Sequence, residues 1–240
     1  MDDVQPPADR ADLQEKLLSI AHRIVDEEGV DKLTVRRLAA EAGVSTMAVY
    51  TRFGSVGAVA AAVRERGFGE FADLMESVGE TEDPLSDLYL QYLLYLRFAA
   101  GHLHLYSLMF QYTSPEWAAG QRAELLQHAA PAETPEGSRS FGAMLRRVER
   151  AYPDADAATT GVRAGEAWAS AHGVAMLGMA GLLGPEALDA VAGSMAVALA
   201  VGHGARRLDA AEASMTRARR RLADEHPGGE RTADDERRAD

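Results

Sequence analysis

The sequence contains no cysteine among its 240 residues. This absence excludes disulfide bonds, thiolate metal sites and cysteine nucleophiles, and it is typical of proteins from a reducing compartment. Lysine is almost absent as well: only Lys16 and Lys32 occur, so arginine supplies nearly all of the 25 basic residues. The 37 acidic residues bring the net charge to −12, so any nucleic-acid site must be local rather than a property of the whole surface.

The chain also lacks long runs of large apolar residues. Its first twenty residues include several acids and no apolar core segment, so no secretory signal is expected. The stretches 167–185 and 190–205 carry no formal charge, but they are rich in alanine and glycine and poor in leucine, isoleucine and phenylalanine. This composition favours two closely packed soluble helices over a membrane hairpin. We therefore expect a cytoplasmic protein with no membrane partner.

The hydrophobic pattern that remains is helical. Leu13, Leu17, Ile20 and Ile24 recur at helical spacing, and no segment alternates as a strand does. Residues 129–138 hold two prolines and a glycine and are predicted to form a loop. Further helices are expected over 35–42, 46–53, 56–71, 85–100, 104–112, 140–151, 156–183 and 186–208, with a last one reaching about 223.

These helices predict an all-α protein of two parts. We divide the chain into a disordered N-terminus (1–9), a three-helix N-terminal domain (10–66), a larger helical domain (67–208) and a charged, partly disordered tail (209–240). In the tail, Arg217, Arg220 and Arg221 share a helix face, which is more typical of a solvated helix end than of a binding surface.

The segment from Leu33 to Phe53 predicts a helix–turn–helix. Thr34 and Ser45 are suitable N-cap residues for two short helices, and Gly43 ends the first of them. The second helix has an apolar inner face. Its remaining positions are Thr46, Met47, Tyr50, Thr51 and Arg52.

These side chains suit a DNA-binding surface. The major groove of B-DNA, ~12 Å wide, admits a helix; hydroxyl and guanidinium groups reach phosphates and base edges, and methionine can pack on a thymine methyl. The local charge agrees, because residues 32–66 hold six basic and two acidic side chains in a chain of net charge −12.

The same segment resembles the N-terminal domain of the tetracycline-repressor (TetR) family of bacterial transcription regulators. The likeness covers about residues 10–66 and is carried by Gly29, Thr34, Val35, Arg36, Leu38, Ala39, Gly43, Val44, Ser45, Tyr50 and Phe53. It implies a sequence-specific regulator that binds a near-palindromic operator as a two-fold dimer, with half-sites about one DNA turn, ~34 Å, apart. It further implies a repressor that a small organic effector releases from its operator.

The resemblance also implies roles for single residues. Arg36 is expected to reach a base or the backbone, whereas Thr46 and Met47 read bases. Tyr50 is expected to contact a phosphate, and Thr34 the DNA backbone. The full set of predicted DNA-binding residues is Thr34, Arg36, Ser45, Thr46, Met47, Tyr50, Thr51 and Arg52.

One position departs from the family pattern. The family usually has a lysine at the start of the fourth helix, where it pairs with phosphate, and this chain has Val56 and Gly57 there. One charged phosphate contact per subunit is therefore expected to be missing. Arg52, which stands where histidine or tyrosine is common, is a candidate to compensate for it.

The C-terminal half resembles the family's effector and dimerisation domain. Trp168 followed by His172-Gly173 is similar to the signature of a subgroup with a Trp-x-x-x-His-Gly motif. The helices over 156–183 and 186–208 are expected to form the homodimer surface through ridges of small residues. These ridges are Ala192, Ala196, Ala200 and Gly204, with Ala169 and Gly173 on the preceding helix.

An effector pocket is expected among the aromatic residues of the larger domain. An apolar cavity with a few polar groups suits a small organic molecule. For any single aromatic residue at helical spacing, however, a core role is the more frequent case. The candidates are Tyr92, Tyr95, His102, Trp168 and His172.

Catalysis is not expected. His102 and His104 point about 200° apart on a helix, so they cannot share a metal. No HExxH sequence, serine elbow or glycine-rich phosphate loop occurs. We expect no enzyme activity, catalytic residue, cofactor or metal. The alternatives are a regulator that is independent of any ligand and, more distantly, a helical enzyme or a non-specific DNA-binding protein.

Overall fold

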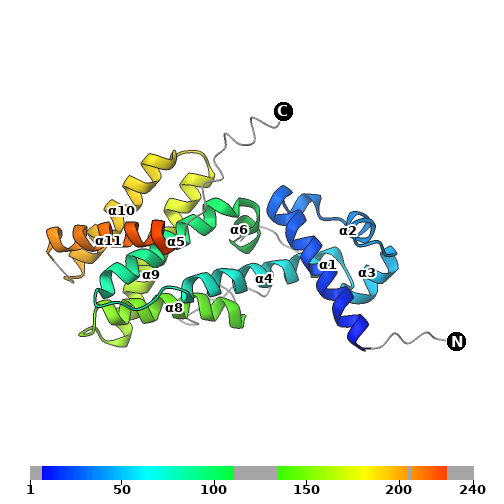
Figure 1. Ribbon diagram of the computed structural model, residues 1–240, viewed down its shortest axis with the longest axis horizontal. Coiled ribbons are helices and arrows are strands. Elements are labelled where there is room, and N and C mark those ends of the chain that lie inside the picture. Colours follow the sequence, from blue (N-terminus) through cyan, green and yellow to red (C-terminus); the bar gives the residue numbers. More distant parts are fainter. Residues whose placement is uncertain (1–6, 111–133, 205–206, 226–240) are drawn as a thin grey trace. The chain divides into compact units, whose positions relative to one another are not determined.

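The computed structural model describes residues 7–110, 134–204 and 207–225, and these residues form helices and turns without a strand (Figure 1). The all-α prediction is confirmed. The structure divides into two compact units, Met1–Phe68 with His102–Arg122 and Gly69–Gly101 with Ala123–Asp240. Helix α4 (Val56–Glu76) contributes to both units, and the chain passes again from the second unit to the first between α5 (Pro84–Gly101) and α6 (Leu103–Phe110).

The first unit begins with α1 (Pro7–Glu28), which is followed by the 3₁₀ turn η1 (Val30–Lys32), α2 (Val35–Ala42) and α3 (Thr46–Phe53). Helix α1 starts inside the stretch that was expected to be disordered, because proline is well tolerated in a first helical turn. Leu17 and Ile24 of the predicted stripe are fully buried.

Helix α6 packs on α1 and on the first half of α4. Gly67 makes the contact with α4 possible, since a Cβ there would lie 3.0 Å from Leu105 Cδ1 and 3.1 Å from Met109 Sδ. His102, just before α6, places its Nδ1 3.0 Å from both carboxylate oxygens of Asp26 in α1. These contacts attach α6 to the helix–turn–helix unit.

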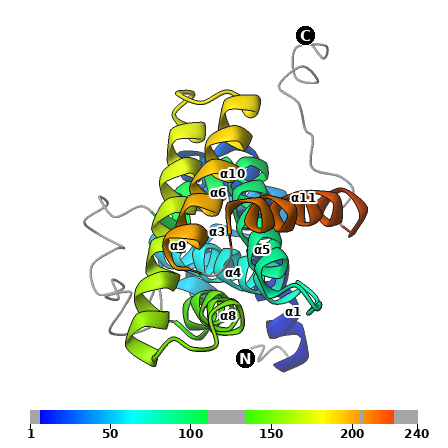
Figure 2. The same ribbon diagram turned by 90° about the vertical axis from the view of Figure 1, so that its left-hand side faces the viewer.

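The second unit is built around α5, whose side chains are buried along most of its length. Helices α8 (Pro135–Ala151), α9 (Ala157–Met179) and α11 (Leu208–Glu225) pack against α5, while α10 (Pro185–Gly202) lies beside α9 (Figure 2). The centre of the core is aromatic: the Trp168 ring meets those of Phe71, Tyr95 and Phe141 edge to face at centroid distances of 5.1–5.9 Å.

Two helix boundaries differ from the prediction. The predicted loop over 129–138 is helical from Pro135 onward, because the hydroxyl of Thr134 accepts the Gly137 N–H at 3.0 Å and the proline occupies the first turn. The predicted helix over 186–208 ends at Gly202, where Gly204 adopts φ 73°. The chain then begins a separate helix, α11, at Leu208.

The prediction of a solvated helix end was wrong for Arg221, whose side chain is 17% exposed, whereas Arg217 is 47% exposed and Arg220 is also exposed. Arg221 Nη1 lies 2.6 Å from Oδ1 of Asp87, and Arg217 pairs with Asp83. Their partners stand 134 residues earlier in the chain, at the start of α5. Helix α11 is thus a packed part of the second unit.

Among the described helices, α10 is long and apolar enough to cross a membrane by length and composition alone. Helices α3 and α4, which are bent by 61° relative to each other, would make a second candidate span if they formed one continuous segment. Core helices of soluble proteins pass the same test. The expectation of no membrane partner therefore stays a prediction.

Candidate DNA-binding surface

Local hydrogen bonds set the geometry of the helix–turn–helix. The hydroxyl of Thr34 accepts the Arg37 N–H at 3.2 Å, and the hydroxyl of Ser45 accepts the Ala48 N–H at 3.2 Å. Between the two helices Gly43 adopts φ 71° and ψ 32°, the left-handed conformation that residues with a Cβ rarely adopt. The two caps and this glycine fix where α2 ends and where α3 begins.

Helix α3 has one buried and one exposed side. Val49 is buried, while Met47 is 70% exposed and Tyr50 is also exposed. Thr46 and Thr51 share the exposed side, although the Thr51 hydroxyl donates to the Met47 carbonyl at 2.8 Å. An apolar side chain as open as Met47 is unfavourable in water alone, and major-groove readers use such groups on thymine methyls.

Neighbouring arginines in α2 have different environments. Arg37 pairs with Glu28 at 2.5 Å and with Glu41 at 2.8 Å. Arg36 is exposed and has no ion-pair partner among the residues that the structure describes. Arg36 therefore keeps its guanidinium available to an external anion, whereas Arg37 is already neutralised.

Fewer basic side chains of this segment are available to DNA than the sequence indicates, because several have partners within the protein. Besides Arg37, Arg66 pairs with Glu15 at 2.7 Å, and Arg64 donates its Nε–H to the Met109 carbonyl at 3.1 Å. Three of the six basic side chains of segment 32–66 are thus engaged by the protein itself. The positive surface that remains depends on few residues, among them Arg36.

Two positions bear on the missing phosphate contact. Arg52 is half-buried, its Nε atom is buried without a hydrogen-bond partner, and no ion pair reaches it among the described residues. Val56 is exposed at the first position of α4, next to the cap that Ser55 provides by accepting the Ala58 N–H at 3.1 Å. A cation introduced at position 56 would stand in solvent at a helix N-terminus.

The structure brings together four of the five candidate pocket residues. In the second unit the hydroxyl of Tyr92 lies 2.8 Å from Ser170 Oγ, and that of Tyr95 lies 3.2 Å from His172 Nδ1. Burial lowers the pKa of His172, so its ring is neutral at pH 7. Tyr95 and Trp168 are buried in the aromatic core, which is the more frequent role for aromatic residues at helical spacing.

His102 does not join this group. It belongs to the first unit and contacts Asp26 there, so its inclusion in the pocket is corrected. Sequence spacing cannot show this, because His102 follows directly on α5 and continues its run of aromatic positions.

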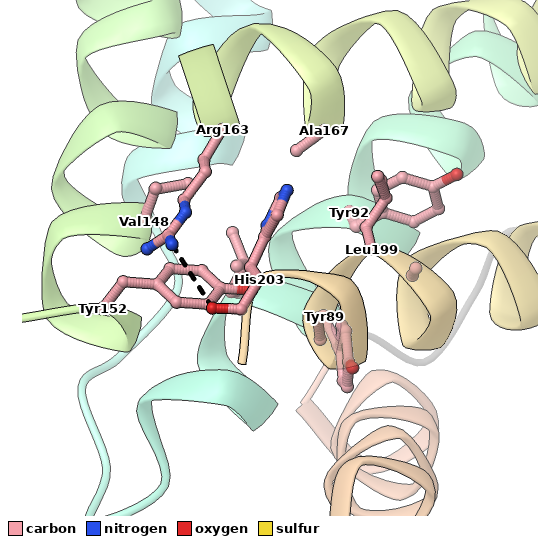
Figure 3. A pocket seen from close by; sticks show the side chains of 11 residues that line it. Tyr89, Tyr92, Val148, Tyr152, Arg163, Ala167, Leu199 and His203 are labelled. Atoms are coloured by element: carbon pink, nitrogen blue, oxygen red, sulfur yellow. Dashed lines mark hydrogen bonds between the residues drawn. The ribbon is translucent and has the colours of Figure 1, made fainter. Parts of the chain in front are cut away.

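Of the predicted pocket residues, only Tyr92 lines the small internal cavity shown in Figure 3. About 20 Å³ of this cavity is open to the centre of a water molecule, which is room for about one water. Three other residues that line the cavity were not among the predicted pocket residues: Tyr152, Arg163 and His203. They come from the end of α8, from α9 and from the end of α10, so no single sequence motif brings them together.

The ridge of small residues on α10 faces inward. Ala192 and Ala200 are buried and Ala196 is only 5% exposed, so this ridge packs inside the subunit. The exposed side of the two helices carries Ala169, Gly173 and Met176 of α9 and Met195, Ala198 and Val201 of α10. We call these six residues the α9–α10 face; three of them, Ala169, Met195 and Ala198, line a groove of about 720 Å³.

Comparisons with known proteins agree with this architecture. Residues 17–63 match the family model described as "Bacterial regulatory proteins, tetR family", and residues 92–201 match "Tetracyclin repressor-like, C-terminal domain". A search of curated proteins gave no match.

Two solved structures are similar over most of their length. A protein of unknown function from Rhodococcus sp. RHA1 shares 26% identity at a TM-score of 0.62, over 79% of this chain and 94% of its own. A tetR-family transcriptional regulator from Streptomyces coelicolor shares 18% identity at a TM-score of 0.60, over 95% of this chain and 96% of its own, a likeness of fold. With a matching DNA-binding domain, a matching C-terminal domain and this helical architecture, the chain belongs to the TetR family and is a DNA-binding transcriptional regulator.

Proposed function

We propose that this protein binds a near-palindromic operator as a homodimer and represses transcription until a small organic effector releases it from DNA. The observation that carries the proposal is the exposed side of α3, where Met47 and Tyr50 stand in solvent on a helix that Ser45 caps, directly after the left-handed Gly43 that ends α2. This is the arrangement of a helix that enters the major groove.

The proposed DNA contacts are those expected from the sequence. Thr46 and Met47 face the bases, Tyr50 and Arg36 are exposed side chains of α3 and α2 that reach the DNA, and Arg52 supplies a further cation. The hydroxyls of Thr34 and Ser45 cap helices, so their contribution is to present the N-termini of α2 and α3 toward phosphates. Thr51 completes the set.

The α9–α10 face is the proposed dimer surface. Its members are apolar or small, and Met195 is 40% exposed in the single subunit. Apolar side chains gathered along a groove of about 720 Å³ are typical of a surface that a second subunit covers. A two-fold pairing here makes the interface self-complementary, and it presents two copies of α3 to two half-sites.

Effector release requires a shift between two states of the dimer. To move the equilibrium from 99:1 to 1:99, the effector must prefer the non-binding state by ~10⁴-fold, about 5.5 kcal/mol. The chain passages between the units within α4 and between α5 and α6 are among the covalent routes for such coupling. A regulator of this kind works where the DNA is, so we place it in the cytoplasm.

The test starts with full-length protein and random duplex DNA. Repeated selection of bound duplexes is expected to return one near-palindromic sequence, and sedimentation is expected to show a dimer. Arg36→Ala should weaken binding to the selected sequence and lower the dependence of log K on log[salt] by about 0.9 per lost phosphate contact. Arg37→Ala is the matched control and should leave this slope unchanged. No enrichment of any sequence would contradict the proposal.

Neighbouring positions on α10 test the dimer surface. Met195→Glu places a charge on the α9–α10 face and should give folded monomers that lose operator affinity. Ala196→Arg places a charge in the core and should unfold the subunit. A dimer that survives Met195→Glu would refute this surface. A reporter gene behind the selected operator distinguishes repression from activation.

A further inference from the structure

The end of α10 lies between an internal cavity and an open hollow. The small cavity that Tyr92 lines and a hollow of about 430 Å³, lined by residues 151–156 and the start of α9, share three lining residues. They are Tyr152, Arg163 and His203. These three residues therefore border both spaces, and we call them the wall; Figure 3 draws them on the side of the small cavity. The hollow alone falls within the ~300–1,000 Å³ that ligand pockets occupy.

Arg163 is the cation of this wall, and most of its hydrogen-bonding capacity is unused. Its guanidinium stacks over the Tyr152 ring, 4.6 Å from the centroid, and donates one hydrogen bond of 3.3 Å to the His203 carbonyl. No carboxylate lies within ion-pair distance of it in the described part of the chain. A part-buried guanidinium with several N–H groups to spare is suited to a planar anion such as a carboxylate.

The acidic residues at the hollow do not neutralise this cation. Asp156 accepts the Thr159 N–H at 2.7 Å as the N-cap of α9, and Asp154 is exposed on the rim. Glu166 accepts a hydrogen bond from His203 Nε2 at 2.7 Å. The rim carboxylates repel an approaching anion only weakly, because salt in the solvent screens charges at that distance. The stacked guanidinium attracts the anion at contact distance, where screening is weak.

The side of the cavity behind the wall is apolar. Val148, Leu88 and Leu199 line it, together with the rings of Tyr89 and Tyr92. His203 stands at the C-cap of α10, directly before Gly204 with φ 73°, and its ring packs edge to face on that of Tyr152. A ligand tail entering there would replace the ring and enlarge a space that now has room for about one water.

The same histidine also lines the groove of the α9–α10 face. Glu166, Leu199 and His203 border that groove, where Met195 and Ala198 also lie. Displacing His203 therefore changes the surface on which the second subunit is proposed to pack. This gives a ligand at the wall a direct effect on the dimer.

We propose that Tyr152, Arg163 and His203 form the effector site, and that the effector is a small carboxylic acid with an apolar tail. The carboxylate binds the guanidinium of Arg163, and the tail displaces the His203 ring and enters the apolar cavity. This inference rests on the proposed function, because it names the site and the chemical class of the effector.

Calorimetry with three probes of one length tests the chemical class. Hexanoate, hexanamide and hexylamine differ mainly in head-group charge. The full-length protein is expected to bind hexanoate, to bind hexanamide at least about tenfold more weakly, and not to bind hexylamine. Equal binding of acid and amide, preference for the amine, or no binding of hexanoate at millimolar concentration would overturn the proposal.

Three variants test the site. Arg163→Gln should reduce hexanoate affinity at least about tenfold, and Arg163→Lys should retain part of it, with circular dichroism as the check that both fold. Asp154→Asn removes a rim carboxylate and should raise the affinity for hexanoate; a decrease would contradict an anionic ligand. Sedimentation and duplex selection without the acid test the proposed function separately. If they succeed while calorimetry fails, only this inference is lost.

Discussion

Asp87 offers a quantitative test of how α11 is held. Its buried carboxylate accepts the Thr81 N–H at 2.9 Å and the Thr81 hydroxyl at 2.8 Å. Arg150 of α8 and Arg221 of α11 donate to it at 2.9 and 2.6 Å. Asp87→Ala therefore removes the common partner of two helices that pack on α5.

The expected cost follows from the exposure of the two arginines. Removing one partner of a buried ion pair costs ~3–5 kcal/mol, because the remaining charge is left without compensation. The side chains of Arg150 and Arg221 are 31% and 17% exposed, so water recovers part of the loss. We expect a loss of about 3 kcal/mol in the free energy of unfolding, and a Tm lower by roughly 6–12 °C for a chain of this size.

The loss depends on pH with a definite sign. Burial opposes ionisation of Asp87, but the hydrogen bonds from Thr81, Arg221 and Arg150 outweigh it and hold the pKa below its usual range. A carboxylate with a lowered pKa stabilises the fold above its unfolded value, ~3.9, and this contribution is lost as the pH falls through the folded value. The difference between wild type and Asp87→Ala should therefore shrink below about pH 4.

Urea unfolding followed by circular dichroism measures these changes. Asp83→Ala is the control, because Asp83 faces the largely exposed Arg217 and caps α5; its loss should cost about 1 kcal/mol. Equal losses for the two variants, or no convergence of Asp87→Ala with wild type in acid, would refute the reasoning.

Three further predictions concern single contacts. Val56→Lys adds a cation at the exposed start of α4 and should steepen the salt dependence of operator binding by about 0.9 per subunit; unchanged slopes would rule out a phosphate there. Gly43→Ala should cost about 1 kcal/mol in thermal unfolding through its φ of 71° alone, since nothing lies within 4 Å of an added Cβ. Tyr92→Phe leaves the buried Ser170 hydroxyl without its 2.8 Å partner and should cost ~1–3 kcal/mol by urea titration; an unchanged midpoint would show that water replaces the bond.

The local elements of the DNA-binding unit could be predicted from the sequence. The limits of α2 and α3 agree with the prediction, because Thr34, Gly43 and Ser45 act on backbone groups within four residues of themselves. The same holds for the all-α class, which follows from hydrophobic periodicity along single helices. The family resemblance rests on this same short, locally determined segment.

Tertiary structure alone decided which residues are available at a surface. Arg36 and Arg37 are neighbours of identical type, yet only Arg37 meets carboxylates from other turns of the fold. Ala196 points inward while Met195 points outward, because the direction of the α10 face depends on where α5 and α9 lie. Arg163, Tyr152 and His203 form one wall although they come from three helices. Composition and spacing describe one helix at a time, whereas charge pairing, burial and cavities arise from side chains that meet only when distant helices pack together.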